Sequence, residues 1–303
     1  FGKSSGNIRG ITLADARISG YITYDPCLGG IVGANSGTVS DCHVAATVTI
    51  RAYLNHYYSY KLGGIVGENK GTVSDCTSAA TLTTNESSLA YHGGIAGYNY
   101  SGTLSHNLAI GAVVPAADNS HGAICGISDG GTLENNYYHA CTVAGTENAT
   151  GVGCGNADVT DNNGAVPAYV LTIGDGVSFL TAMADNLGFR YDGNGDGQDE
   201  NYWRKGAQLT LNDAGYNDAE YTVTQTADGT EITGTAIIDN VLTMPGYDIT
   251  VSFSGEPIDW ANDGHSGTET DPYIIYNKTQ LDQLAQRVNS GEGDAATGYS
   301  GKY

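Results

Sequence analysis

Positive charge is scarce in this sequence. Its 303 residues include 12 lysines and arginines against 33 aspartates and glutamates, which gives a formal net charge of -21 at pH 7. Proteins that bind nucleic acid or anionic lipid contact the phosphates with clustered basic side chains. The charge balance therefore argues against both as partners, and a surface this acidic attracts cations instead.

Long apolar runs and several short enzyme motifs are also missing. No stretch approaches the roughly 18 apolar residues of a membrane-spanning helix, so we expect no direct membrane insertion. The sequence contains no CxxC pair and no HExxH motif, which argues against a structural zinc site and against a metallopeptidase. No signal peptide is seen, and the first residue, Phe1, falls inside a repeat, so we expect the chain to come from a longer protein.

What the sequence does contain is a repeat. GGIVGANSGTVSDC begins at Gly29 and GGIVGENKGTVSDC begins at Gly63. Weaker copies begin at Gly93, Gly122 and Gly151, so the starts lie 34, 30, 29 and 29 residues apart. A fixed period of about 20–50 residues is typical of solenoids, propellers and other arrays.

The length of the repeat favours a parallel β-helix. The first copy holds three short β-like runs, GGIVG, GTVSDC and AATVTI, each too short to bury a core alone. Stacked coils would bury them against one another, whereas a propeller blade needs about 40–45 residues and four strands. We therefore predict a mostly β protein with a parallel β-helix over residues 1–165.

Aligned copies predict which side chains stack. One column of isoleucines should face the core: Ile31, Ile65, Ile95 and Ile124. Glycines two positions later should mark a corner with unusual φ: Gly33, Gly67, Gly97, Gly126 and Gly155. The cysteine that ends the motif, Cys42 or Cys76, shares its column with Ile11, Asn107 and Asn136, so we interpret it as a small inward side chain near a turn.

Two other cysteines form a column of their own. Cys125 and Cys154 occupy the same position in successive copies. Neighbouring coils lie about 4.8 Å apart, a separation that a disulfide accepts. The pair is a disulfide candidate, and two buried thiols are the alternative.

The pattern GGIVGxNxGTVSDC resembles the GLUG motif. Residues 1 to about 165 resemble the GLUG-repeat arrays of bacterial surface proteins and of the non-catalytic parts of some immunoglobulin A peptidases. The resemblance implies an extracellular location at the bacterial cell surface and an adhesive or structural role. It implies no particular ligand.

After Pro167 the repeat is lost and alternating β patterns follow. Residues 168–255 resemble small internalin-type B-repeat domains, whose final strand carries the signature found here as Thr243–Val251. We expect residues 166–256 to form a small β-sandwich or β-grasp-like module. The resemblance implies a spacer or a binding appendage.

Within that module, YDGNGDGQDENYW contains the first half of a calcium loop. The predicted ligands are Asp192, Asn194, Asp196, Gln198 and Glu200. Trp203 occupies the position of the final EF-hand glutamate, which excludes a standard EF-hand. The alternatives are a calcium site, the one cofactor we expect, and a solvated acidic turn.

The last segment, 257–303, resembles the leading segment of GLUG arrays, with a DPYII strand and a short helix. Thr279 and Asp282 resemble a capping box at the start of that helix. Two interpretations stay open. Either the chain is a cut from a longer array, or 257–303 of one chain completes the β-helix of the next in a head-to-tail filament.

An insertion in one coil, RAYLNHYYSYK, concentrates aromatic side chains. We expect a projecting loop in which the candidate ligand-binding residues are Tyr53, His56, Tyr57, Tyr58 and Tyr60. Packing of these tyrosines along the solenoid is the alternative. His92 and His121 stack in neighbouring coils, and either hold a metal or replace leucine.

Parallel β-helices also include polysaccharide-active enzymes, but glycoside hydrolysis needs two opposed carboxylates, and we expect no such cluster across adjacent coils. The sequence therefore predicts a non-enzymatic, adhesin-like surface segment, with a polysaccharide-active enzyme as the alternative. Its expected partner is a host or bacterial surface glycan or protein, or a copy of itself.

Overall fold

The structure is a computed structural model that describes residues 1–21, 26–53, 60–84, 90–110, 121–143, 146–147, 164–174, 179–182, 188–191, 200–211, 221–239 and 241–253. The chain divides into two compact units. The first holds Phe1–Tyr169 and Leu187–Arg204, and the second holds Val170–Asn186 and Lys205–Tyr303. Residues 187–204, which we expected in the middle module, thus group with the repeat. No helix in the described ranges is long and apolar enough to span a membrane.

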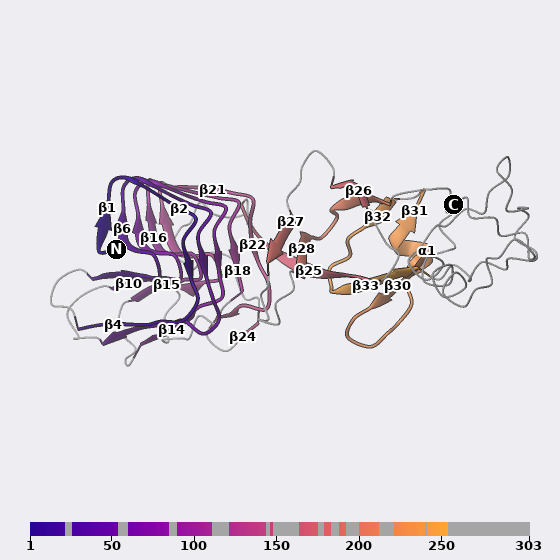
Figure 1. Cartoon of the computed structure of the whole chain (residues 1–303), viewed down its shortest axis with the longest axis horizontal. Coiled ribbons are helices and arrows are strands. Elements are labelled where there is room, and N and C mark those ends of the chain that lie inside the picture. Colours follow the sequence, from indigo (N-terminus) through magenta and orange to yellow (C-terminus); the bar gives the residue numbers. More distant parts are fainter. Residues whose placement is uncertain are drawn as a thin grey trace, which may run out of the picture. The chain divides into compact units, whose positions relative to one another are not determined.

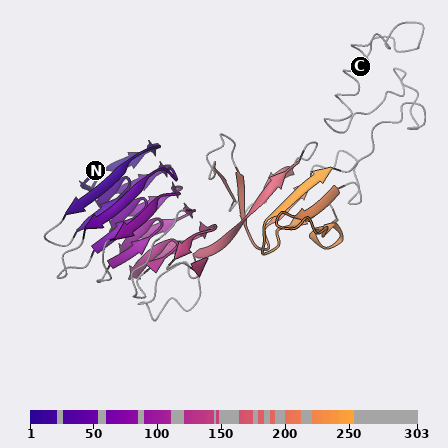
Figure 2. The same ribbon diagram turned by 90° about the horizontal axis from the view of Figure 1, so that it is seen from below.

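The first unit contains a β-solenoid of about four turns, which confirms the β-helix and the mostly β character of the chain. Figure 1 shows its coils nearly end on, and Figure 2 shows them stacked side by side. A coil such as the one from Cys27 to Tyr53 has five short strands instead of the three expected, because turns divide the predicted runs. Strands at equivalent positions pair in parallel and form five ladders, named A to E below.

The ladders run through successive coils in a constant order. Ladder A consists of β1 (Lys3–Ser4), β6 (Val32–Asn35), β11 (Val66–Asn69), β16 (Ala96–Tyr100) and β20 (Cys125–Asp129). Ladder B consists of β2 (Asn7–Arg9), β7 (Thr38–Ser40), β12 (Thr72–Ser74), β17 (Thr103–Ser105) and β21 (Thr132–Glu134). Ladder C begins with β3 (Thr12–Leu13), β8 (His43–Val44), β13 (Thr77–Ser78), β18 (Leu108–Ala109) and β22 (Asn136–Tyr138).

The remaining two ladders are shorter. Ladder D consists of β4 (Arg17–Tyr21), β9 (Thr49–Tyr53) and β14 (Thr81–Thr84). Ladder E consists of β5 (Cys27–Gly29), β10 (Tyr60–Gly63), β15 (Ala90–Gly93) and β19 (His121–Gly122). A small antiparallel pair, β23 (Thr142–Val143) with β24 (Thr146–Glu147), follows the last coil.

The register of the ladders matches the aligned repeat. Leu62 pairs with Leu28 on one side and with His92 on the other. The predicted isoleucine column is buried, and each backbone N–H donates to the carbonyl of the next isoleucine along the stack, as from Ile65 to Ile95 at 3.0 Å. Because equivalent residues stack directly, the solenoid core follows from the repeat.

Gly33, Gly67, Gly97 and Gly126 do not have the unusual φ that we expected, and Gly155 lies outside the described residues. Gly67 lies within β11, and a Cβ there would lie 2.6 Å from the backbone nitrogen of Leu28. Ladders A and E therefore approach too closely for any side chain. The left-handed corner lies instead at the residue before the inward cysteine or asparagine, with φ near 50° at Asp41, Asp75, His106 and Asn135.

Two columns of buried asparagines tie the coils together. In the first, Asn35 donates to Asn69 and Asn69 donates to Asn99, each at 2.9 Å. In the second, which continues the Cys42 and Cys76 column, Asn107 donates to Asn136 at 2.8 Å. The amides also donate to backbone carbonyls, Asn69 to Gly71 and Asn107 to Val73, so the asparagines satisfy backbone groups near the corners.

An aromatic hairpin packs on the outside of ladder C. Its strands are β27 (Gly188–Tyr191) and β28 (Glu200–Arg204), and they pair with Tyr191 opposite Glu200. Its rings contact three histidines, with ring centres 5.7 Å apart for Tyr191 and His43, 4.3 Å for Phe189 and His106, and 5.3 Å for Tyr202 and His139. Ladder C continues into β25 (Ala165–Ile173), whose first residues pair with β22.

The second unit has no repeat and is mainly antiparallel. One sheet contains β26 (Phe179–Ala182), β29 (Gln208–Leu211), β32 (Val241–Thr243) and β31 (Ile237–Ile238). Elsewhere in the unit β33 (Ile249–Phe253) pairs with β30 (Tyr221–Gln225) and with the end of β25. The short helix α1 spans Thr233–Ala236. The β-sandwich or β-grasp arrangement stays a prediction, and the capping segment 257–303 with its helix lies outside the described residues.

Candidate binding face

Side chains from ladders A and E meet on the outside of the solenoid at the tight turn between these ladders. Lys61 of β10 and Glu68 of β11 are seven residues apart in the sequence, and Lys61 Nζ lies 3.2 Å from Glu68 Oε2. Tyr91 follows Lys61 along ladder E, and Tyr98 follows Glu68 along ladder A. We call the cluster of Lys61, Glu68, Lys70, Tyr91, Tyr98 and Tyr100 the tyrosine face.

Two lysines of the tyrosine face share the carboxylate of Glu68. Glu68 is 8 % exposed, and Lys70 Nζ lies 2.7 Å from its second carboxylate oxygen. Burial alone would raise the pKa of Glu68, but the two ammonium groups outweigh burial and lower that pKa. Glu68 is therefore held in its ionised form.

The tyrosines form a connected set of rings over these charges. Ring centres lie 5.6 Å apart for Tyr91 and Tyr98, and 5.8 Å apart for Tyr98 and Tyr100. Lys61 Nζ lies 5.2 Å from the Tyr98 ring centre, a cation–π arrangement. The Tyr98 hydroxyl donates to Asp129 at 3.0 Å, and burial together with this carboxylate raises the pKa of Tyr98. The rings are thus fixed by neighbours on both sides.

The arrangement of the tyrosine rings is better suited to ligand binding than to catalysis. Tyr100 is 45 % exposed, so its ring is open to solvent beside the half-buried rings of Tyr91 and Tyr98. Flat rings with polar edges contact sugar rings and protein surfaces. The two lysines and Glu68 leave one positive charge, which the neighbouring Asp129 carboxylate balances, so the face together with Asp129 carries no net charge.

Most of the predicted tyrosine loop lies outside the described residues, including His56, Tyr57 and Tyr58. Tyr53 is half-buried, and the Arg51 guanidinium lies 4.8 Å from its ring centre. We expected Tyr60 to present its ring to a ligand. Instead its side chain is fully buried. It is buried because it begins β10 and packs with Ala52 and Leu62.

The predicted calcium loop connects the two strands of the aromatic hairpin. Asp192, Asn194, Asp196 and Gln198 lie outside the described residues. Glu200 begins β28, and its carboxylate accepts a hydrogen bond from the Tyr202 hydroxyl at 3.3 Å. Elsewhere in the described ranges, no three His, Cys, Asp or Glu side chains are close enough to hold a metal ion. The calcium site stays a prediction.

The other candidate residues lie in the solenoid interior. Cys125 is a buried free thiol whose pKa burial raises to about 12, and its predicted partner Cys154 lies outside the described residues. His92 and His121 are buried with their Nδ1 atoms 2.9 Å apart. The pentapeptide GISDG fits the GxSxG pattern of serine hydrolases, but Ser128 is buried and accepts a hydrogen bond from Asn99.

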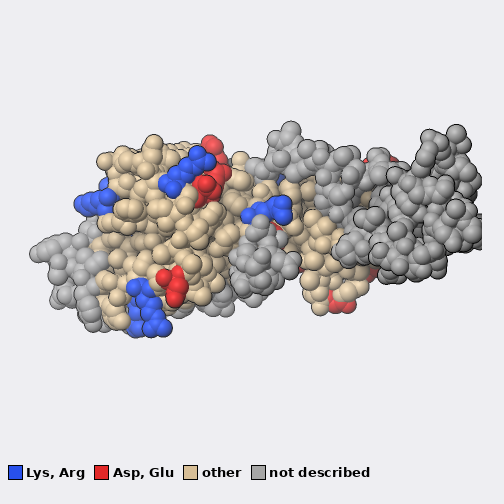
Figure 3. Space-filling model, in the orientation of Figure 1, with Lys and Arg blue, Asp and Glu red and all other residues tan. Residues whose placement is uncertain are grey.

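Sequence reasoning missed the tyrosine face, although the signal was present. In the repeat alignment Ala34, Glu68 and Tyr98 share one column, and Lys61 precedes Tyr91 in another. The alignment does not show that these two columns lie next to each other in space. Their proximity depends on the glycine contacts between ladders A and E. On the face shown in Figure 3, the charged side chains of the described residues lie in small groups among uncharged ones.

Comparisons with known proteins support the repeat assignment. Residues 25–49 match the family model described as the GLUG motif. No curated protein and no solved structure matches this chain. The GLUG resemblance is thereby confirmed for this part of the solenoid, whereas the resemblance to internalin-type B-repeats stays a prediction.

Proposed function

We propose that this chain is a non-enzymatic segment of an extracellular protein of the bacterial cell surface, in which a rigid β-solenoid presents the tyrosine face to a neutral surface glycan. The observation that carries the proposal is the connected set of three tyrosine rings, held over two lysines whose charges Glu68 and the neighbouring Asp129 balance. The GLUG match supports a structural repeat role for the scaffold.

A glycan fits the chemistry of the face better than a charged partner does. Stacking on aromatic rings orients a sugar ring, and the Lys70 ammonium and the Asp129 carboxylate stand where hydroxyl groups can exchange hydrogen bonds. Binding residues carried on a rigid scaffold lose little entropy when the ligand binds. Stacked ladders supply that rigidity on either side of Tyr98.

The state of Glu68 supports the non-enzymatic part of the proposal. A glycosidase needs one carboxyl group that is protonated at working pH and a second carboxylate opposite it. Two lysines hold Glu68 in its ionised form, so it has no proton to donate as a general acid. A polysaccharide-active enzyme is the alternative, and turnover of a panel of polysaccharides that Glu68→Gln abolishes would favour it.

A glycan array tests the proposal. The wild-type chain is expected to bind a set of neutral glycans, and the double variant Tyr98→Ala/Tyr100→Ala is expected to lose at least tenfold in affinity, or about 1.4 kcal/mol or more, for the lost ring contacts. Tyr247→Ala, which removes an exposed tyrosine of the second unit, is the matched control. Equal binding by the double variant and the control would contradict the proposal.

A head-to-tail filament is a second candidate. Strands β1, β2, β3 and β4 stand at the ends of ladders A to D, so their outer edges can pair with another chain. Light scattering and negative-stain microscopy, with calcium and then with a chelator, test this candidate. Long threads would support a filament in which 257–303 completes the next chain, and monomers under both conditions would contradict it.

A further inference from the structure

A pocket at the last coil of the solenoid lies away from the tyrosine face. It has a volume of about 400 Å³ and is lined by Leu133, Glu134, Asn135, Tyr137, Gly164, Val166 and Arg204. Ligand pockets in proteins span roughly 300–1,000 Å³. All seven residues belong to the first unit, from β21, β22, β25 and β28 and the turns beside them.

One buried polar group in the pocket lacks a partner. Tyr137 is 1 % exposed, and its hydroxyl makes no hydrogen bond in the structure. Burial raises the pKa of this phenol to about 12, while the nearby positive charge of Arg204 opposes the rise. A buried hydroxyl without a partner is costly to a fold, so its position in the wall of a pocket suggests that a ligand completes its bonding.

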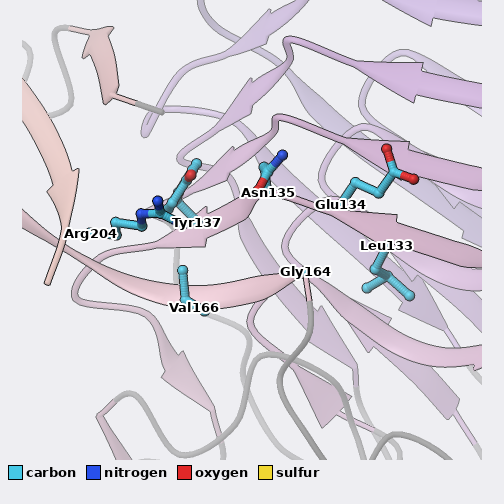
Figure 4. A pocket seen from close by; sticks show the side chains of 7 residues that line it. All are labelled: Leu133, Glu134, Asn135, Tyr137, Gly164, Val166 and Arg204. Carbon is cyan, nitrogen blue, oxygen red and sulfur yellow. The ribbon is translucent and has the colours of Figure 1, made fainter. Parts of the chain in front are cut away.

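The two ends of the pocket differ in charge. Figure 4 shows Arg204 and Tyr137 close together on one side, and Glu134 on the other side beyond Asn135. Arg204 is half-buried, and neither Glu134 nor another described acidic group lies within ion-pair distance of it. A guanidinium and a phenol hydroxyl at one end can bind a carboxylate. A carboxylate and an amide at the other end can bind hydroxyl groups.

We propose that this pocket binds a sugar acid of the hexuronate class, with the sugar carboxylate on Arg204 and Tyr137 and the sugar hydroxyls on Asn135 and Glu134. Val166 and Leu133 supply the apolar contact that the face of a pyranose ring needs. The inference goes beyond the proposed function, because it concerns a different surface and an acidic ligand.

NMR titration of the full chain with D-glucuronate, and separately with D-glucose, tests the inference. Glucuronate is expected to bind at millimolar concentration and at least tenfold more tightly than glucose. Arg204→Gln should weaken glucuronate binding at least tenfold, whereas Arg190→Gln, which changes an exposed arginine of the same hairpin, should leave it unchanged. Tyr137→Phe should weaken binding several-fold without lowering the melting temperature, because the hydroxyl that it removes has no partner.

Three results would overturn the inference: no glucuronate binding by the folded wild type, equal binding of glucose and glucuronate, or equal effects of Arg204→Gln and Arg190→Gln. If Arg204→Gln lowers the melting temperature, Arg204→Lys keeps the charge, and it should still bind more weakly than wild type because it loses the planar fork. Tyr98→Ala/Tyr100→Ala should not affect glucuronate binding, so failure of this site and failure of the tyrosine face can be distinguished.

Discussion

The solenoid and the second unit stabilise their strands in different ways. In the solenoid, each strand pairs with the same strand of the neighbouring coils, and equivalent side chains stack in columns, as Val39, Val73 and Leu104 do. In the second unit, β29 pairs with β26 and β32 in antiparallel fashion, and no residue has an equivalent on the neighbouring strand. Because of these columns, we expect a substitution at any repeated inward position to destabilise the solenoid. In the second unit we expect destabilisation mainly from substitutions of individual buried side chains.

The difference extends to charge and thiols. Of the 33 acidic residues, 12 lie in residues 1–169, four in residues 187–204 and 17 in the second unit, whereas all six cysteines lie in residues 1–154. Inward cysteines fit columns that need a small apolar side chain. The acidic surface expected from the net charge is therefore concentrated outside the solenoid.

The largest expected effect is from a methyl group placed between two ladders. Gly67→Ala puts a Cβ 2.6 Å from Leu28 N and 2.7 Å from the Gly33 carbonyl oxygen, so backbone must move. We expect a loss of about 3 kcal/mol in the free energy of unfolding, measured by urea denaturation. In the second unit, Gly234→Ala meets no atom within 4 Å and should be neutral or slightly stabilising. Similar losses for both variants would contradict the comparison.

A smaller loss is expected when one asparagine is removed from its column. Asn69→Leu removes the acceptor of the Gly71 backbone N–H and the donor to the Asn99 side-chain oxygen, together with one of the bonds of the Asn35 amide. We expect a loss of about 2 kcal/mol in the free energy of unfolding, because buried polar groups would be left unsatisfied. The control is Asn7→Leu in β2, where the side chain is exposed and the change should be small. A loss for Asn69→Leu no greater than that of the control would show that the ladder contributes little.

The ion pair in the tyrosine face should produce a pH-dependent effect. The pKa of Glu68 is lowered below its ordinary value of 4.5 in the folded chain, so its contribution is present above pH 4.5 and is lost as the pH falls through the folded pKa. Lys61→Met removes one of the two lysines, and we expect a loss of about 1 kcal/mol above pH 4.5 that shrinks at lower pH. Unfolding measured from neutral to acidic pH checks this expectation, with Lys205→Met of the second unit as the control. A loss that does not change with pH would contradict it.

The smallest signal should come from native-state alkylation. Burial raises the pKa of the Cys125 and Cys141 thiols to about 12, so both should resist iodoacetamide at pH 8. Cys27, which is half-buried at the edge of ladder E, should react first. Mass spectrometry of digested protein measures each site, and rapid labelling of Cys141 without denaturant would show that the last coil opens locally.

Much of the solenoid was predictable because its repeat fixes both the register and the inward columns. The aligned copies predicted the buried isoleucines and the shared column of Cys42, Cys76 and Asn107. They did not predict that the left-handed corner falls on Asp41 and Asp75, because glycine was the stronger local signal for an unusual φ.

The candidate site was harder to predict because it depends on distances between different ladders. Lys61 meets Glu68 only because ladders A and E pack with no side chain between them. The hairpin carrying Arg204 begins at Gly188, 50 residues after Tyr138, where the coil strand β22 ends. It still groups with the solenoid, and no periodicity in the sequence signals such a contact. Composition alone favoured the tyrosine-rich insertion, whose Tyr60 is buried.

The measurement that tests the account most directly compares the two groups of tyrosines on one glycan ligand. Affinities of the wild type, of Tyr98→Ala/Tyr100→Ala and of Tyr57→Ala/Tyr58→Ala would be determined side by side by calorimetry. We predict at least a tenfold loss in affinity for the first double variant, or about 1.4 kcal/mol or more, and little change for the second. A loss confined to Tyr57→Ala/Tyr58→Ala would contradict the account and assign binding to the insertion instead of the tyrosine face.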